Sequence, residues 1–155
     1  MARAALRMSR ALSTQGAAEV RHIFAYGSLR PDDDSGQEWT KAFVAGMTQR
    51  KGSVGPAALY EEDFACAVLL DGGPSRIVGW ALGCDDAALF DRRLAEADVI
   101  EEYVPDGSGD YDRAAVDVRL DEGGTVKAWV YHVPRCLKEK HIPSGDWLQR
   151  DTKQH

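Results

Sequence analysis

An apolar, strand-like pattern meets a glycine turn at residues 24–29, which read Phe24-Ala25-Tyr26-Gly27-Ser28-Leu29. A strand that opens into such a turn can cradle an anionic group, because successive backbone N–H groups can point at it. Glycine at position 27 also lets a ligand approach the chain closely. Residues 30–36 are polar and rich in turn formers, which predicts that a strand over residues 22–29 ends there. A tight turn without a ligand fits the same residues, so this stretch alone leaves both interpretations open.

Composition restricts the class of protein. The 155 residues suffice for one domain with a substantial core, and 44% hydrophobic residues are typical of a globular protein. A net charge of −6 argues against non-specific binding to nucleic acid, and the apolar runs are too short to span a membrane. The odd number of cysteines favours a reducing compartment over a disulfide framework or a zinc site. We expect no metal and no cofactor. The cysteines are Cys66, Cys84 and Cys136.

The N-terminal segment differs in charge from the remainder. Residues 1–21 hold four arginines and one glutamate, which gives +3 and leaves −9 for the other residues. A basic, acid-poor segment with arginines on one helical face is typical of an organelle transit peptide, and a loosely structured tail fits as well. We therefore expect residues 1–20 to be a basic tail and residues 21–150 to form the domain. The location would be cytoplasmic, or mitochondrial or plastid if the tail is a transit peptide.

Several strands and few helices are predicted along the domain. Apolar runs favour strands over residues 64–70 and 76–83, separated by a firm turn at 71–75. Gly55-Pro56 interrupts the run over residues 53–60, which predicts a bent or edge strand. Residues 39–46 give a weak pattern that fits a helix or the entry of a strand. Asp85-Asp86 favours a helix that begins near Ala87, because aspartate caps helix N-termini well.

The clearest strand pair is predicted near the C-terminus. Apolar residues alternate with polar ones over 113–121 and again over 126–131, on either side of Gly123-Gly124. Period-two alternation around a glycine turn is typical of a hairpin with one buried face. Short links and a shortage of helices indicate an α+β or barrel-like fold rather than a doubly wound parallel sheet.

A glutamate falls on the apolar face of the predicted helix. Phe90, Leu94 and Ala97 share one face, and Glu101 lies almost in line with Phe90 if the helix extends that far. A buried lone carboxylate is costly, so it must be paired, neutral or functional. Burial also raises its pKa and makes it a better base near neutral pH. Alternatively, the helix ends by Val99 and Glu101 is a solvated loop residue.

These features belong to an ordered set of motifs that resembles a known family. The set comprises Tyr26-Gly27-Ser28-Leu29, Leu59-Tyr60, Asp98-Val99-Ile100-Glu101, Tyr111-Asp112-Arg113 and Ser144-Gly145-Asp146-Trp147. In this order they resemble the motifs of the γ-glutamylcyclotransferase superfamily, in its small AIG2-like branch, which includes the γ-glutamylamine cyclotransferases. The resemblance covers about residues 22–148. It is stronger than any one of the motifs, because YGSL alone is a modest signal.

The chain departs from the family pattern at three positions. Ala97 stands where leucine is usual, Glu102 where glycine is common, and Ala57 where the Gly-x-Leu-Tyr element has glycine. An alternative alignment would use Leu94 as the leucine and place Asp98 at the catalytic position. The continuation Glu101-Glu102-Tyr103-Val104-Pro105 fits the family pattern better, so we expect the catalytic position at Glu101.

The resemblance implies a small mixed β-barrel with a few flanking helices and a pocket at its mouth. It implies a catalytic Glu101 and a substrate-binding loop that begins at Tyr26. Tyr111 could instead be a core residue, and Arg30 could instead be a solvated charge. Tyr103 is a weaker candidate for the pocket lining. The histidines share no ligand spacing, Cys66 fits a small buried hydrophobe, and Asp32–Asp34 fits a solvated loop. The expected substrate-binding residues are Tyr26, Gly27, Ser28, Leu29, Arg30 and Tyr111.

The implied reaction is an internal cyclisation. The α-amine of a γ-glutamyl amine or amino acid attacks its own side-chain amide, 5-oxoproline forms, and the amine or amino acid leaves. Glu101 would take a proton from the α-ammonium and return one to the leaving amine. A small γ-glutamyl molecule is thus the expected partner, with neither nucleic acid nor membrane. A non-catalytic binding module on the same fold, a lyase acting on an antibiotic or polyamine-like intermediate, and a structural β protein are the alternatives.

Overall fold

The computed structural model describes residues 20–33, 38–62, 64–134 and 140–150. The expected tail, apart from Val20, and Cys136 lie outside these ranges, as does Asp34 of the acidic run. Among the described residues, no helix is both long and apolar enough to cross a membrane.

Five strands close into a barrel in the order β1-β5-β2-β6-β7. Four of the five neighbouring pairs are antiparallel, and β1 meets β7 in parallel where Ile23 lies opposite Trp129. Closure of this kind removes exposed strand edges. The strands are β1 (His22–Ala25), β2 (Thr48–Val54), β5 (Ile77–Gly83), β6 (Asp112–Leu120) and β7 (Thr125–His132).

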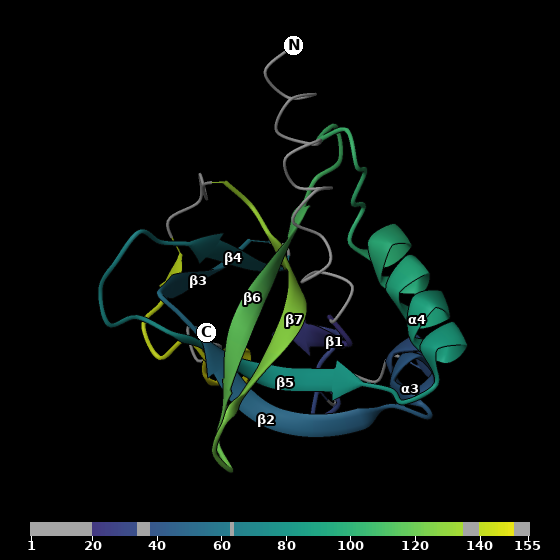
Figure 1. The fold of residues 1–155 in the computed structure, drawn as a ribbon. Coiled ribbons are helices and arrows are strands. Elements are labelled where there is room, and N and C mark those ends of the chain that lie inside the picture. The colour runs from purple at the N-terminus through teal and green to yellow at the C-terminus, as the bar shows by residue number, and fades with distance from the viewer. Residues whose placement is uncertain (1–19, 34–37, 63, 135–139, 151–155) are drawn as a thin grey trace.

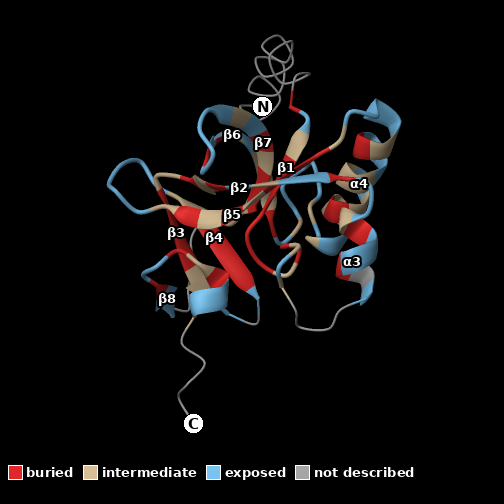
Figure 2. Ribbon diagram, turned by 90° about the horizontal axis from the view of Figure 1, so that it is seen from below, coloured by how far each residue is buried: buried red, intermediate tan, exposed pale blue. Residues whose placement is uncertain are grey.

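A smaller sheet and two helices flank the barrel on opposite sides (Figures 1 and 2). The sheet has the order β4-β3-β8, and a short 3-10 helix follows it in the chain. This arrangement confirms the predicted small mixed barrel with flanking helices. The elements are β3 (Ala57–Glu61), β4 (Ala65–Leu69), β8 (His141–Ile142), α3 (Glu38–Val44), α4 (Ala87–Ile100) and η1 (Trp147–Gln149).

Strand β1 is buried on both faces because it separates two apolar clusters. Phe24 packs into the cluster formed with the small sheet, which includes Val118 and Val130. Ile23 and Ala25 pack into a second cluster, beneath the helices, that includes Phe90. Strand β1 ends at Ala25 and residues 26–29 are a turn, so the predicted strand over 22–29 was too long.

The predicted C-terminal hairpin is confirmed. Strands β6 and β7 pair in antiparallel register, and the turn between them uses positive φ angles of 108° at Gly123 and 81° at Gly124. The expectation of a single buried face was wrong for the end of β7. Tyr131 is 2% exposed and packs in the second cluster, where Trp129 is half-buried.

The remaining predicted elements differ mainly at their ends. The weak pattern over 39–46 forms α3, and Gly55-Pro56 separates two strands, β2 and β3, instead of bending one. The helix after Asp86 begins as expected, because the Asp86 carboxylate accepts hydrogen bonds from the backbone N–H groups of Ala88 and Leu89.

Helix α4 extends to Ile100, one residue short of Glu101. Phe90 and Ala97 are buried, while Ile100 at the edge of the stripe is 40% exposed. Glu102 then adopts φ 51°, a left-handed conformation that terminates helices and favours glycine. Glu102 occupies the position at which the resembled family commonly has glycine, and its backbone conformation is one that glycine adopts more easily than glutamate.

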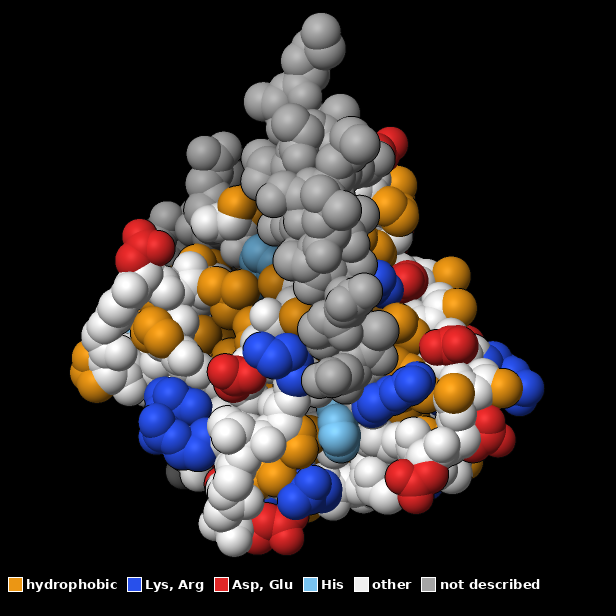
Figure 3. Space-filling view, viewed as in Figure 1, with side chains coloured by type: hydrophobic (Ala, Val, Ile, Leu, Met, Phe, Trp, Pro, Cys, Tyr) orange, Lys and Arg blue, Asp and Glu red, His pale blue; other side chains and the backbone are white. Residues whose placement is uncertain are grey.

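The surface carries mixed charge. On the face shown in Figure 3, basic and acidic side chains are interspersed instead of being segregated by sign. That face therefore offers no extended basic surface for a polyanion such as nucleic acid to bind.

Candidate active site

A small pocket opens where the end of β1, the turn after it, the start of β4 and the end of α4 meet. Its cavity is about 30 Å³, enough to hold at least one water molecule. Five of the six residues expected to bind substrate line it, together with Glu101. The lining residues are Phe24, Ala25, Tyr26, Gly27, Ser28, Leu29, Phe64, Ala65, Glu101, Tyr111 and Tyr131.

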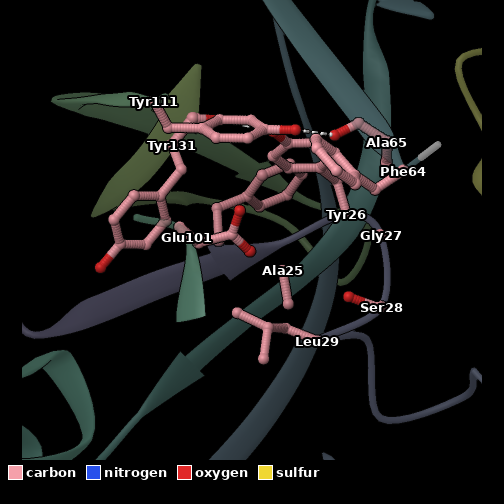
Figure 4. Close-up of a pocket in the computed structure, with 11 residues that line it drawn as sticks. Ala25, Tyr26, Gly27, Ser28, Leu29, Phe64, Ala65, Glu101, Tyr111 and Tyr131 are labelled. Atoms are coloured by element: carbon pink, nitrogen blue, oxygen red, sulfur yellow. Dashed lines mark hydrogen bonds between the residues drawn. The ribbon is translucent and has the colours of Figure 1, made fainter. Parts of the chain in front are cut away.

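Glu101 is the residue at the C-cap of α4, where its backbone N–H donates to the carbonyl of Ala97. Its carboxylate points into the pocket and faces the Ser28 hydroxyl across Ala25 (Figure 4). Loss of solvent around the carboxyl raises the pKa of Glu101 to about 7. The side chain forms no ion pair within the described residues. The geometry therefore provides an acid that can exchange a proton near neutral pH.

The turn after β1, whose residues line the pocket, contains backbone N–H groups without a partner among the described residues. It is closed by the Arg30 N–H, which donates to the carbonyl of Gly27 at 3.0 Å, and the Thr40 hydroxyl donates to the carbonyl of Ser28 at 3.1 Å. Across the described parts of the chain, no hydrogen bond uses the N–H groups of Gly27, Ser28 or Leu29. Such a group of unused donors suits a carboxylate or a developing oxyanion.

The tyrosines of the pocket are anchored through their hydroxyls. The Tyr26 hydroxyl donates to the carbonyl of Tyr131 at 2.6 Å, and the Tyr111 hydroxyl donates to the carbonyl of Ala65 at 2.7 Å. Burial raises the pKa of both hydroxyls above the ordinary value, so both stay neutral. The ring of Tyr111 lies 5.9 Å from that of Phe64. These rings form an apolar wall that keeps water from the carboxyl of Glu101.

Gly27 lies directly against strand β4. A Cβ atom at this position would come within 2.7 Å of the Ala65 Cβ, closer than side chains tolerate. We expect Gly27→Ala to displace the turn and to lower the turnover proposed below by at least tenfold, because small misplacements of reacting groups are costly.

The matched control for Gly27→Ala removes the Ala65 methyl group that the new side chain would contact. The double variant Gly27→Ala/Ala65→Gly removes the facing methyl group and is expected to recover most of the activity. The measurement is kcat/KM for each variant beside its melting temperature. Equal activity of the single and double variants would show that the contact with Ala65 does not explain the need for glycine.

Arg30 is the one expected substrate-binding residue that the fold keeps outside the pocket lining. Its side chain is 1% exposed and bonds Asp32 through Nε and Nη2, both at 2.8 Å. Nη1 bonds Asp146 at 2.8 Å, which joins the turn to the segment before η1. Asp32 is thus paired, whereas the acidic run was expected to be a solvated loop.

The two acids of the Asp98–Glu101 segment occupy different places. Asp98 lies outside the pocket lining, and its carboxylate binds Arg113 and the hydroxyl of Tyr131. Glu101 is the acid that lines the pocket. The geometry therefore favours the alignment that places Glu101 at the catalytic position.

Sequence reasoning missed five of the lining residues: Phe24, Ala25, Phe64, Ala65 and Tyr131. Four of them belong to apolar runs whose members are indistinguishable by pattern. Tyr131 shares a strand face with Lys127, so alternation places it on the polar side of the hairpin. A tyrosine at the end of such a strand is the one available signal, because a large amphipathic ring is often partly buried.

The other groups considered in the sequence do not line this pocket. Cys66 is buried, as expected, with its Sγ 3.6 Å from the Tyr111 hydroxyl. His141 packs on Tyr60 with the ring centres 5.1 Å apart. Within the described ranges, no cluster of three histidine, cysteine or acidic side chains could hold a metal ion.

Solved structures share this fold. An uncharacterised protein from Pyrococcus horikoshii matches with a TM-score of 0.55 and 19% identity, over 87% of this chain and 99% of its own. YkqA from Bacillus subtilis has a TM-score of 0.55 and 20% identity, over 82% of this chain and 39% of its own. A protein from Arabidopsis thaliana has a TM-score of 0.51 and 24% identity, over 74% of this chain and 62% of its own. At these identities the likeness concerns the fold.

The amino-acid sequence, more than the fold, shows the family of this chain. No curated protein matches it significantly. The model of the family described as "Gamma-glutamyl cyclotransferase, AIG2-like" matches residues 23–149, most of the chain. The chain therefore belongs to the AIG2-like γ-glutamyl cyclotransferase family, as the motifs in the sequence indicated.

Proposed function

We propose that this protein is a cyclotransferase that converts a γ-glutamyl amine or γ-glutamyl amino acid to 5-oxoproline and a free amine. The observation that supports this most directly is the carboxyl of Glu101, whose pKa is raised to about 7 in a pocket beside unused backbone donors. Membership of a cyclotransferase family supports the same reaction class. The proposal covers amine and amino-acid leaving groups alike, because every γ-glutamyl compound presents the same glutamyl half.

Glu101 is the proposed general base and acid. The substrate's α-amine, an ammonium with a pKa near 8, must lose a proton before it attacks the side-chain carbonyl. The carboxylate takes that proton and the amine nitrogen bonds to the carbonyl carbon. Glu101 then protonates the leaving amine as its C–N bond breaks, and takes up the second proton that the ring nitrogen loses. Atoms balance without water, since the products together contain the atoms of the substrate. Such acid–base catalysis contributes about 10²–10⁴-fold.

The turn is the proposed anion site. The N–H groups of Gly27, Ser28 and Leu29 would hold the α-carboxylate or the amide oxygen as it gains charge. The Ser28 hydroxyl faces Glu101 in Figure 4, and we propose that it would orient the amine between them. Tyr26 and Tyr111 would contact the substrate through their rings, because their hydroxyls already donate to backbone carbonyls. Arg30 would support the turn from behind, without touching the substrate.

The pocket is partly open to solvent, so a γ-glutamyl substrate would enter past the side chains at its mouth. Phe64 is the exposed member of the lining, with 48% of its surface accessible. Its displacement would widen the pocket beside Tyr111 while the turn and Glu101 keep their places.

The decisive experiment is a substrate panel with 5-oxoproline release as the readout. The panel holds γ-glutamyl amino acids, the ε-lysine conjugate and γ-glutamyl amines, and each leaving amine is quantified beside 5-oxoproline. Equal amounts of the two products from at least one class would support the proposal. Saturable binding without products would favour the non-catalytic binding module. Neither binding nor products would refute the proposal.

The pH dependence follows from the raised pKa of Glu101. Only the carboxylate can accept the α-ammonium proton, so kcat/KM should fall as the pH drops through about 7, tenfold for each further unit. A descending limb is expected above the pKa of the substrate amine. The measurement is a profile between pH 5.5 and about 9. An acid limb near 4.5, the ordinary value for glutamate, would contradict a buried base.

A further inference from the structure

We propose that Asp98 and Arg113 are positioning residues that hold the Glu101 carboxyl in the pocket, through a clamp that also includes Tyr131. Neither Asp98 nor Arg113 lines the pocket, so neither would touch the substrate. The consequence for catalysis rests on the function proposed above. The consequence for Glu101 itself does not, and it can be measured without a substrate.

The clamp ties the last turn of α4 to the barrel. Asp98 lies three residues before Glu101, and its two carboxylate oxygens contact Arg113 Nη1 at 2.8 and 2.7 Å. The Tyr131 hydroxyl donates to Oδ1 of Asp98 at 2.6 Å. The end of α4 is thereby fixed to β6 through Arg113 and to β7 through Tyr131.

The guanidinium of Arg113 is itself held in place. Its central carbon lies 4.7 Å from the ring centre of Tyr103 and 4.6 Å from that of Trp129. Stacking between two rings fixes the plane in which an arginine can bind a carboxylate. Because Tyr103 follows Glu101 by two residues, the clamp grips the chain on both sides of Glu101.

Tyr131 connects the clamp to the opposite wall of the pocket. Its hydroxyl binds Asp98, and its backbone carbonyl accepts the hydrogen bond from the Tyr26 hydroxyl at 2.6 Å. One residue of β7 therefore sets the place of the turn on one side and of the end of α4 on the other. The distance between the turn and Glu101 depends on both bonds.

A contribution to folding alone does not account for this arrangement. The side chains of Arg113 and Asp98 are 18% and 27% exposed, and partly exposed ion pairs contribute little to stability on average. Geometry is more sensitive, because a displacement of about 1 Å can reduce a rate by about 10²-fold. The larger effect is therefore expected on turnover and on the environment of Glu101.

The groups around Glu101 allow an effect of its position on its pKa to be distinguished from an effect of neighbouring charges. The titratable groups that face it are Tyr26, Tyr111 and Tyr131, and burial keeps the pKa of each above the ordinary range, so they are neutral. Cys66 lies beyond Tyr111. The two charged residues of the clamp, Asp98 and Arg113, form an ion pair that is neutral overall.

The test compares Asp98→Asn, Arg113→Gln and the double variant. The two single variants leave opposite charges near Glu101, so a purely electrostatic effect would shift the pKa of Glu101 in opposite directions. Loss of position admits water in all three variants and should lower that pKa toward 4.5 in each. The pKa is measured by ¹³C NMR titration of the Glu101 carboxyl in the full chain, and melting temperatures verify folding.

Turnover provides the second readout. Each single variant should lower kcat by about 10–100-fold with KM changed less than threefold, and the double variant should match the singles because the pair acts as a unit. Glu96→Gln, which breaks the 3.1 Å pair with Arg93 on the same helix, is the matched control and should leave kcat and the Glu101 titration unchanged.

The outcomes separate the clamp from the proposed function. Absence of 5-oxoproline with the wild-type protein would refute the function, and the NMR titration would still decide the clamp. A Glu101 pKa that stays at the wild-type value, or opposite shifts in the two single variants, would overturn the clamp. If Asp98→Asn does not fold, Tyr131→Phe removes the 2.6 Å bond to Asp98 and keeps the ring, and a lowered Glu101 pKa is again the expected result.

Discussion

Replacement of Glu101 by glutamine is expected to lower 5-oxoproline formation by about 10²–10⁴-fold while the protein stays folded. Glutamine keeps the shape of the side chain but cannot accept the proton of the α-ammonium. The substrate would still bind through the turn, so the loss should fall on kcat and not on KM. The measurement is steady-state turnover at pH 8, with circular dichroism to verify the fold.

The pH dependence of folding stability provides a second test of Glu101→Gln that needs no substrate. The pKa of Glu101 is raised in the folded protein from 4.5 to about 7, so the folded state disfavours the ionised form. The stability that the neutral carboxyl contributes is fully present below about pH 4.5 and is lost as the pH rises toward 7. Glutamine does not ionise, so Glu101→Gln should be more stable than the wild type at pH 8 and similar to it at pH 4.

Glu102 supplies the matched control for Glu101→Gln. It follows Glu101 directly, but its side chain is exposed and lies outside the pocket. Glu102→Gln should keep wild-type turnover. Near-normal activity of Glu101→Gln, or an equal loss in both variants, would remove Glu101 from the role of base.

The sequence predicts local elements of this fold better than its closure. Alternation around Gly123-Gly124 predicts the β6–β7 hairpin because neighbouring strands are specified by local pattern and turn chemistry. The barrel closes where Ile23 meets Trp129, across more than a hundred residues. No local pattern encodes that contact, so the strand pattern favoured an α+β or barrel-like fold and the family resemblance favoured a closed barrel.

In the candidate site, too, local features could be predicted from the sequence and long-range contacts could not. Helical periodicity placed Glu101 in line with Phe90, because Glu101 directly follows the last residue of the helix that carries Phe90. The same helix could not reveal the role of Asp98, whose partners are on β6 and β7. Arg30 was expected either to bind substrate or to be solvated, since a buried arginine is recognised only by its partners in the fold.

Arg30 carries the second large prediction. Its buried guanidinium holds Asp32 and Asp146, whose side chains are 32% and 15% exposed. Removal of one member of a buried ion pair leaves the other uncompensated and costs about 3–5 kcal/mol. We expect Arg30→Met to lower the free energy of unfolding by about that amount, as measured by urea denaturation. Arg30→Lys should lose less, because an ammonium keeps the charge but cannot reproduce the forked contacts.

The exposed pair between Arg50 and Glu122 is the control for Arg30. Its side chains are 39% and 60% exposed, so Arg50→Met should cost less than about 1 kcal/mol. Arg30→Lys, assayed where it remains folded, separates the two roles of Arg30. A supporting role predicts that KM for the γ-glutamyl substrate stays within about threefold of wild type, because the guanidinium lies behind the turn. A stable Arg30→Met protein with a strongly raised KM would instead place Arg30 in contact with the substrate carboxylate, and the turn would then have to open when substrate binds.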